Sequence, residues 1–211
     1  MVKKETERDR QSAKKRAMIY QAAVELFKTY GYEQTTVDDI AAAVGMSKGS
    51  VYHFYPQKID MLHFFFQEVS GKGMRALDCT SSALLQRPAQ AILDYCVGIA
   101  TAYDQIGYDL SIYLQNVYAE RSRESGMDPH TFVSDLEAFV AAAQQAGTFD
   151  DGVSAREAAN IIHTAAAGIF RKWILDGGKY ASADANRWFM PRILNTFVPE
   201  KARIPSAACP Y

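Results

Sequence analysis

At 211 residues the chain is long enough for one large domain, or for a small domain joined to a larger one. Its hydrophobic content of 48% is ordinary for a protein with a full apolar core, and no apolar run reaches the roughly 18–20 residues that span a membrane. The net charge of −1 does not by itself suggest a nucleic-acid partner. Residues 1–60 carry ten basic against eight acidic residues, however, and the remainder carries a net charge of −3.

The three cysteines, Cys79, Cys96 and Cys209, lack the spacing of a metal site or of a disulfide scaffold. The N-terminus mixes both charges and has no apolar segment behind it, so we expect a cytoplasmic protein without a secretion signal. The histidines are scattered, and neither a Ser/His/Asp nor a Cys/His arrangement nor a glycine-rich phosphate loop is recognisable. We therefore expect no catalytic centre, no metal and no cofactor.

The N-terminal quarter predicts a solvated arm and then a helix. The arm extends to about Gln11, and apolar residues recur with a period of 3.6 over residues 19–30. Gly31 is placed to end that helix with a left-handed residue. Thr36 with Asp39 three residues later is a capping box that opens a short second helix.

A third short helix follows after a tight turn. Gly45 supplies the positive φ that a three-residue turn between helices requires, and Ser47 is a good N-cap. Pro56 ends the helix, because the residue before a proline is driven out of the helical region. The apolar positions expected at the crossing of the second and third helices are Ile40, Ala41, Val44, Val51 and Phe54. This spacing is typical of a helix-turn-helix unit.

Six further helices are expected downstream. They cover residues 57–77, 88–105, 110–121, the stretch from a turn at 125–129 to about 146, 154–175, and 184–197. Neither strand alternation nor an internal repeat is found, so we predict an all-α fold of about nine helices. A helix-turn-helix domain is expected over 1–57, a larger helical domain over 58–198, and a disordered-looking tail over 199–211.

The run AAVELFKTYGYEQTTVDDIAAAVGMSKGSVYHFYPQKIDML (22–62) closely resembles the N-terminal DNA-binding domain of the TetR family of bacterial regulators. The positions that carry the resemblance are Ala23, Leu26, Phe27, Gly31, Tyr32, Thr35, Thr36, Val37, Ile40, Ala41, Gly45, Ser47, Lys48, Gly49, Val51, Tyr52, Lys58 and Leu62. Tyr55 and the pair Pro56–Gln57 depart from the usual pattern. The rest of the chain is similar only in length and helical pattern.

The resemblance implies that residues 47–53 form the recognition helix. The residues nearest to base edges would be Lys48, Gly49 and His53. The residues that would hold phosphates are Thr36, Ser47, Tyr52 and Lys58. The chemistry agrees, because lysine donates to guanine or phosphate and a helix N-terminus binds anions. The alternatives are a solvated lysine, a packed tyrosine, or a residue that only begins or ends a helix.

In the resembled family the C-terminal part dimerises and holds a small-molecule inducer. The helices at 154–175 and 184–197 are rich in small and in large apolar residues, which suits a four-helix interface across a two-fold axis. The candidate interface residues are Ile162, Ala166, Ile169, Trp173, Trp188, Phe189 and Ile193. The alternative is that both helices belong only to the internal core.

Aromatic residues of the larger domain are candidates to line an apolar pocket. These candidates are Phe65, Phe66, Tyr95, Tyr103, Tyr113, Phe139 and Phe170. Aromatic residues at helical spacing also form ordinary core, which is the alternative for each of them. A pocket of this composition would take an apolar or aromatic ligand with a few hydrogen-bonding groups.

We therefore predict a homodimeric, TetR-like transcriptional regulator, a repressor that binds a palindromic double-stranded DNA operator and is released by a small-molecule inducer. The helix at 57–77 is the expected lever between DNA and ligand. A DNA-binding architectural or protein-interaction factor that needs no ligand is the alternative on the same fold. An enzyme and a membrane protein are not expected.

Overall fold

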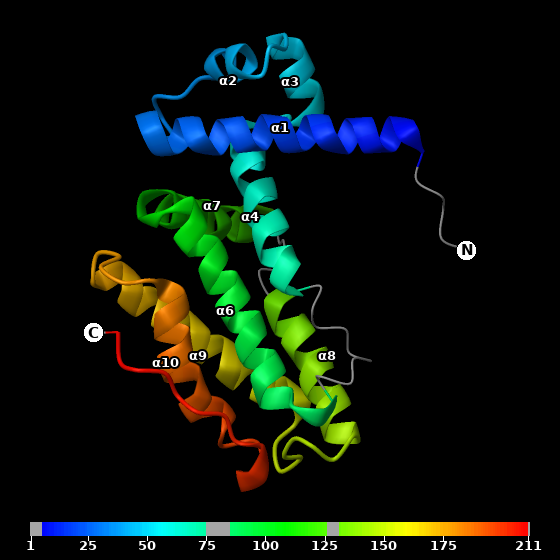
Figure 1. The fold of residues 1–211 in the computed structure, drawn as a ribbon, viewed down its shortest axis with the longest axis vertical. Helices are drawn as coiled ribbons and strands as arrows, with labels where there is room; N and C mark the ends of the chain where they lie inside the picture. Colours follow the sequence, from blue (N-terminus) through cyan, green and yellow to red (C-terminus); the bar gives the residue numbers. More distant parts are fainter. Residues whose placement is uncertain (1–5, 75–84, 126–130, 211) are drawn as a thin grey trace. The chain divides into compact units, whose positions relative to one another are not determined.

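The computed structural model describes residues 6–74, 85–125 and 131–210, and it describes the side chains there except in 70–74, 121–125 and 131–132 (Figure 1). Over these residues the regular elements are nine α-helices and one short 3-10 helix, and no strand is present. The all-α prediction is therefore confirmed. No helix of this described part is both long enough and apolar enough to cross a membrane.

The helices α1 (Glu7–Tyr30), α2 (Val37–Ala43) and α3 (Lys48–Phe54), with the first turns of α4 (Lys58–Met74), form an N-terminal unit. Helix α1 begins at Glu7, so the solvated arm expected as far as Gln11 is helical from there on. The cause is a capping box: the hydroxyl of Thr6 accepts from the N–H of Asp9 at 3.2 Å, and the Asp9 carboxylate accepts from the N–H of Thr6 at 3.0 Å.

The N-terminal unit extends to residue 68, beyond the boundary expected at 57. Its buried apolar side chains are Ile19, Ala23, Val24, Phe27, Val37, Ile40, Ala41, Val51, Ile59, Met61 and Leu62. The ring of Tyr20 packs on Phe64, and the Tyr55 hydroxyl donates to the carbonyl of Arg16 at 3.2 Å. The ring contact of Phe64 holds the start of α4 to α1, and the hydroxyl of Tyr55 holds the end of α3 to α1, so α4 begins as part of the N-terminal unit.

The second compact unit covers residues 69–211. Its helices are α6 (Pro88–Ile106), α7 (Tyr108–Ser125), α8 (Thr131–Gln145), α9 (Ala155–Leu175) and α10 (Ser182–Leu194), followed by the 3-10 helix η1 (Glu200–Ala202). Helix α10 packs along α6, and α9 packs against both α8 and α10 (Figure 1). The core includes Ile92, Tyr95, Leu136, Val140, Ala158, Ile162, Met190 and Leu194.

Two helices of this unit begin where the sequence predicts them, and α7 begins earlier than expected. Pro88 occupies the first turn of α6, and the Ser154–Glu157 capping box opens α9 as predicted. Helix α7 begins at Tyr108 instead of residue 110 and continues to Ser125. Residues 75–77 of the helix expected at 57–77, and residues 126–129 of the expected turn, lie outside the described residues.

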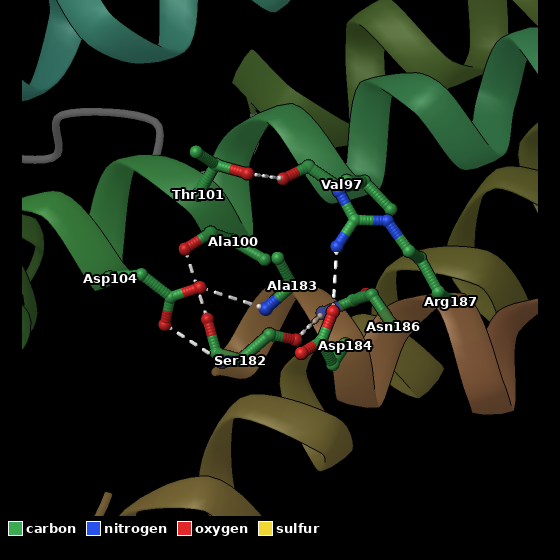
Figure 2. A network of polar contacts seen from close by, with 9 residues as sticks. All are labelled: Val97, Ala100, Thr101, Asp104, Ser182, Ala183, Asp184, Asn186 and Arg187. Atoms are coloured by element: carbon green, nitrogen blue, oxygen red, sulfur yellow. Dashed lines mark hydrogen bonds and ion pairs between the residues drawn. The ribbon is translucent and has the colours of Figure 1, made fainter. Parts of the chain in front are cut away.

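Helix α10 begins two residues earlier than expected because a side chain from another helix caps it. Its own N-cap residue, Ala181, offers no side-chain acceptor. The Asp104 carboxylate of α6 accepts instead from the N–H groups of Ser182 at 2.7 Å and Ala183 at 3.0 Å (Figure 2). The hydroxyl of Ser182 also donates to the carbonyl of Ala100 at 3.0 Å. A carboxylate at a helix N-terminus satisfies orphan N–H groups and complements the helix dipole.

Part of the tail that was expected to be disordered has a defined place beside α10. The amide of Asn195 exchanges two hydrogen bonds with the backbone of Ile204, each 2.9 Å long. The N–H of Ala207 donates to the carbonyl of Arg187 at 3.2 Å. Since Ile204 also packs against the apolar core, residues 200–207 belong to the C-terminal unit.

Asp104→Ala should destabilise the protein by about 1–2 kcal/mol, because two N–H groups at the start of α10 lose their acceptor. The free energy of unfolding in urea measures this loss. Asp151→Ala, in an exposed loop, is the matched control and should stay within about 0.5 kcal/mol of the parent protein. Equal stability of the two variants would show that the carboxylate of Asp104 does not hold α10.

Candidate functional site

Helix α2 is fixed at its start by the predicted capping box. The Thr36 hydroxyl accepts from the N–H of Asp39 at 3.2 Å, and the Asp39 carboxylate accepts from the N–H of Thr36 at 2.8 Å. The hydrogen bond from the Thr36 hydroxyl lowers the pKa of Asp39. Thr36 therefore already has a structural task, and its proposed contact with phosphate rests on the family resemblance.

Helix α3 is placed by a turn, a cap and one buried side chain. Gly45 has φ +65°, as predicted, and the N–H of Met46 closes the turn onto the carbonyl of Ala41 at 2.9 Å. The hydroxyl of Ser47 accepts from the N–H of Ser50 at 3.2 Å, which confirms the expected N-cap. Val51 is wholly buried, so it anchors α3 in the N-terminal unit.

The opposite face of α3 is open to solvent. Lys48, Gly49, Tyr52 and His53 are all exposed, and at 100° per residue they fall within one side of the helix. The Tyr52 side chain is 43% exposed. A Cβ added at Gly49 would meet no atom within 4 Å, so no internal packing requires glycine there. The structure thus brings together four of the predicted DNA-contacting residues.

Lys48 is not a solitary surface lysine. Its ammonium lies 2.7 Å from the carboxylate of Asp38 on α2, and the hydrogen bond raises the pKa of Lys48. Both side chains are largely exposed, and such pairs contribute little to stability. The ammonium of Lys48 could therefore leave the Asp38 carboxylate for an oxygen of a base or a phosphate with little loss of free energy.

Lys58 has a role that neither the resemblance nor its alternative included. Its ammonium donates to the carbonyls of Tyr32 at 2.5 Å and Thr35 at 3.0 Å. It also lies 4.1 Å from the centre of the Tyr32 ring. Burial lowers the pKa of Lys58. Lys58 therefore fastens the loop before α2 to the first turn of α4, and of the three donors of its ammonium two are used within the protein.

The predicted pocket residues are distributed over several places. Phe65 belongs to the N-terminal unit, where its ring meets that of Tyr20 at 5.9 Å between centres. Tyr95 and Phe139 are core residues of the C-terminal unit with ring centres 5.5 Å apart. Phe66 and Tyr113 are half-buried. The remaining pair, Tyr103 and Phe170, has ring centres 4.4 Å apart and lines a cavity.

This cavity, of about 40 Å³, lies between α6, α9 and α10. It is lined by Cys96, Ile99, Ala100, Tyr103, Ala166, Phe170, Ser182 and Asn186. Burial raises the pKa of the Cys96 thiol to about 12, so this thiol stays protonated at neutral pH. A wider, open hollow of about 430 Å³ lies between α6 and the tail, next to Arg187 and residues 205–207.

Asn186 gives the small cavity a polar wall. The residue is only 5% exposed, and its amide nitrogen donates to the carbonyl of Ser182 at 3.0 Å. Its amide oxygen has no hydrogen-bond partner within the described part of the chain. A buried acceptor without a donor costs about 1–3 kcal/mol. Sequence reasoning missed Asn186 because no local pattern brings α10 beside residues 96–103.

Three of the seven predicted interface residues lie inside the chain's own core. Ile162, Ile169 and Trp173 are each at most 4% exposed, so they present no surface to a second protomer. The other four, Ala166, Trp188, Phe189 and Ile193, are half-buried. The large apolar side chains that α9 exposes are Ile161 at 45% and Leu175 at 70%.

A family model described as bacterial regulatory proteins, tetR family, matches residues 19–63 of this chain. The matched range contains all of α2 and α3 and the start of α4. It begins at Ile19, which is the first buried residue of α1. The match therefore covers the part of the N-terminal unit that packs as a compact body.

Similar proteins extend the likeness over the C-terminal unit. The fatty acid metabolism regulator protein of Bacillus subtilis (strain 168) is 21% identical over 173 residues, which are 81% of this chain and 89% of that protein. SmeT, the repressor of the Stenotrophomonas maltophilia multidrug efflux pump SmeDEF, has a TM-score of 0.67 at 19% identity, with 91% of this chain and 94% of that chain covered. Thermus thermophilus FadR, a repressor in complex with lauroyl-CoA, has a TM-score of 0.56 at 18% identity, with 93% and 99% covered. The two structures show a shared fold.

Lys58→Met should lower the free energy of unfolding by about 1–3 kcal/mol, because two carbonyls of the loop before α2 lose a charged donor. Thermal unfolding measures the loss, and hydrogen exchange at residues 31–36 locates it. The matched control is Lys201→Met, which changes an exposed lysine of η1. Unaltered exchange at the loop would show that the ammonium of Lys58 does not hold it.

Proposed function

This chain belongs to the TetR family of bacterial regulatory proteins, and on that premise we propose that it is a DNA-binding transcriptional repressor. A homodimer binds a palindromic operator, and a small molecule releases it. The exposed face of α3, held by the buried Val51 and the Gly45 turn, is the observation that carries the proposal. A helix presented in this way can enter the major groove of DNA.

Each exposed residue of α3 has a defined part in the proposed interface. Lys48 leaves or shares Asp38 to donate to a guanine edge or a phosphate, and His53 meets a base edge. Gly49 lets the start of the helix come close to the DNA. The hydroxyl of Tyr52 and the N-terminus of α3 at Ser47 hold phosphates, which fix the register of the helix on the duplex.

Two features of α9 support a homodimer. Ile161 and Leu175 expose apolar surface, and Ala167 and Gly168 between them are exposed small residues that permit close helix approach. Half-buried side chains of α10, among them Trp188 and Ile193, extend the same kind of surface. A two-fold axis would pair this surface with itself. An operator with half-sites one turn of DNA apart requires the two α3 helices of the dimer to lie about 34–36 Å apart.

The cavity beside Asn186 is the proposed polar end of the ligand site. The unpaired amide oxygen calls for a hydroxyl or N–H group, and none of the lining residues is basic, so an anionic group has no partner among them. FadR is seen with lauroyl-CoA, and the apolar lauroyl chain of that ligand supports an apolar part in a ligand of this chain. Release requires a ligand that binds more tightly to the state with low operator affinity.

A second candidate function is a DNA-binding factor that needs no ligand. The volume of the cavity favours it, since about 40 Å³ is the space of a single water molecule and far below that of a drug-sized site. Ligand release therefore requires the wall of the cavity to move, with the half-buried ring of Phe170 as the side chain best placed to do so.

Selection of bound duplexes from random DNA, with and without a metabolite extract, tests both functions. We expect a palindrome with half-sites about ten base pairs apart, less of it recovered in the presence of extract, and a loss of affinity of about tenfold or more for His53→Ala. Lys201→Ala is the control. An unselective pool contradicts operator binding, and a palindrome that no extract releases supports the ligand-independent factor.

Ile161→Asp should give a folded monomer, because it places a charge on the proposed dimer surface. Its neighbour Ile162→Asp should instead unfold the protein, since that side chain is wholly buried and an isolated charge there is costly. Sedimentation equilibrium and circular dichroism distinguish the two results. An Ile161→Asp protein that dimerises as tightly as the parent would exclude this face of α9 from the interface.

A further inference from the structure

The positive charge of the N-terminal unit is concentrated in one segment. Residues 7–18, here termed the basic extension, contain five basic and two acidic residues, a net charge of +3. Residues 19–68, the compact body that carries α3, contain three basic and six acidic residues, a net charge of −3. The part of the unit that would read DNA is therefore acidic, and the segment that precedes it is basic.

The three lysines of the compact body are all engaged. Lys28 pairs with Glu25 at 3.5 Å, Lys48 pairs with Asp38 at 2.7 Å, and Lys58 donates to two backbone carbonyls. Contacts between cations and phosphates supply nearly all of the non-specific affinity of a protein for DNA and a large share of its specific affinity. The compact body thus offers few cations for this purpose.

The basic extension offers cations in an ordered form. Arg8, Lys14, Lys15 and Arg16 are exposed, and their side chains make no ion pair or hydrogen bond with any described residue. The capping box at Thr6 keeps them on a helix. Such a helix holds its charges at fixed positions, in contrast to a flexible arm.

The extension reaches past the compact body. None of residues 7–18 is buried, and the first buried side chain of α1 is Ile19. Figure 1 shows this N-terminal part of α1 continuing beyond α2 and α3. Twelve residues at 1.5 Å each give a rod of about 18 Å, the length of about five base pairs at 3.4 Å. Packing does not account for the rod, and it lies outside the range of the family match.

We propose that the basic extension binds phosphates of the DNA that flanks the base pairs read by α3. Its charge complements the duplex, and it is continuous with the unit that presents α3. This inference rests on the proposed DNA-binding function, and it adds a contact that is independent of sequence. The extension raises affinity for every operator, while the exposed face of α3 chooses among them.

The test replaces Arg8, Lys14, Lys15 and Arg16 together by Gln, which is a similarly good helix former. The DNA is the selected palindrome, either trimmed to the base pairs that α3 reads or with ten further base pairs on each side. Affinity is measured between 50 and 200 mM salt. For the parent protein, the flanks should strengthen binding, and the slope of log K against log salt should exceed that of the variant by about 0.9 for each phosphate that the four cations neutralise.

The control variant replaces Arg87, Lys179, Lys201 and Arg203 by Gln, four exposed cations of the C-terminal unit. It should keep the salt slope and the flank dependence of the parent protein, and circular dichroism should show equal helix content in all three proteins. Parent and extension variant with the same slope and the same flank dependence would overturn the inference. Failure of the selection to return any palindrome for the parent protein would instead overturn the proposed DNA-binding function.

Discussion

The candidate interface depends on the burial of Val51. Helices α2 and α3 have seven residues each, and a helix of that length is not stable by itself in water. Their shape is therefore maintained by what surrounds them: two capped N-termini, the Gly45 turn, and apolar side chains enclosed by α1 and α4. Because Val51 and Ile40 are wholly buried, the remaining face of α3 can consist of polar residues and glycine without loss of the fold. The exposed residues Gly49, Tyr52 and His53 of that face are thus not needed to hold the helix in place.

Two charged side chains link segments that are distant in sequence through hydrogen bonds to the backbone. The ammonium of Lys58 binds carbonyls of the loop before α2, and the carboxylate of Asp104 binds the first N–H groups of α10. In each case an ion satisfies backbone groups at the end of a helix or loop, where no regular partner exists. Lys58 makes this link in the N-terminal unit, and Asp104 makes it in the C-terminal unit.

Sequence patterns could predict the structural features whose partners are close together along the chain. Capping boxes at Thr36 and Ser154 and the positive φ of Gly45 were predictable because all their partners lie within a few residues. The box at Thr6 is equally local, but the high charge of the segment around it favoured a solvated arm instead. The Asp104 cap on α10 and the hydrogen bonds from Lys58 to the carbonyls before α2 join residues that are distant in sequence, so no local pattern predicts them. For α9, apolar residues occur on both faces, so periodicity could not decide that Ile162 is internal and Ile161 is not.

The separation of charge along the N-terminal unit gives it an electric dipole, with a positive rod joined to a negative body. In the field of a duplex such a dipole experiences a torque, which turns the rod towards the phosphates. The Debye length at physiological ionic strength is about 8 Å, less than half the length of the rod, so the torque acts only at close range. The orientation of the unit on the duplex would then be set late in the encounter, once the rod lies within about a Debye length of the phosphates.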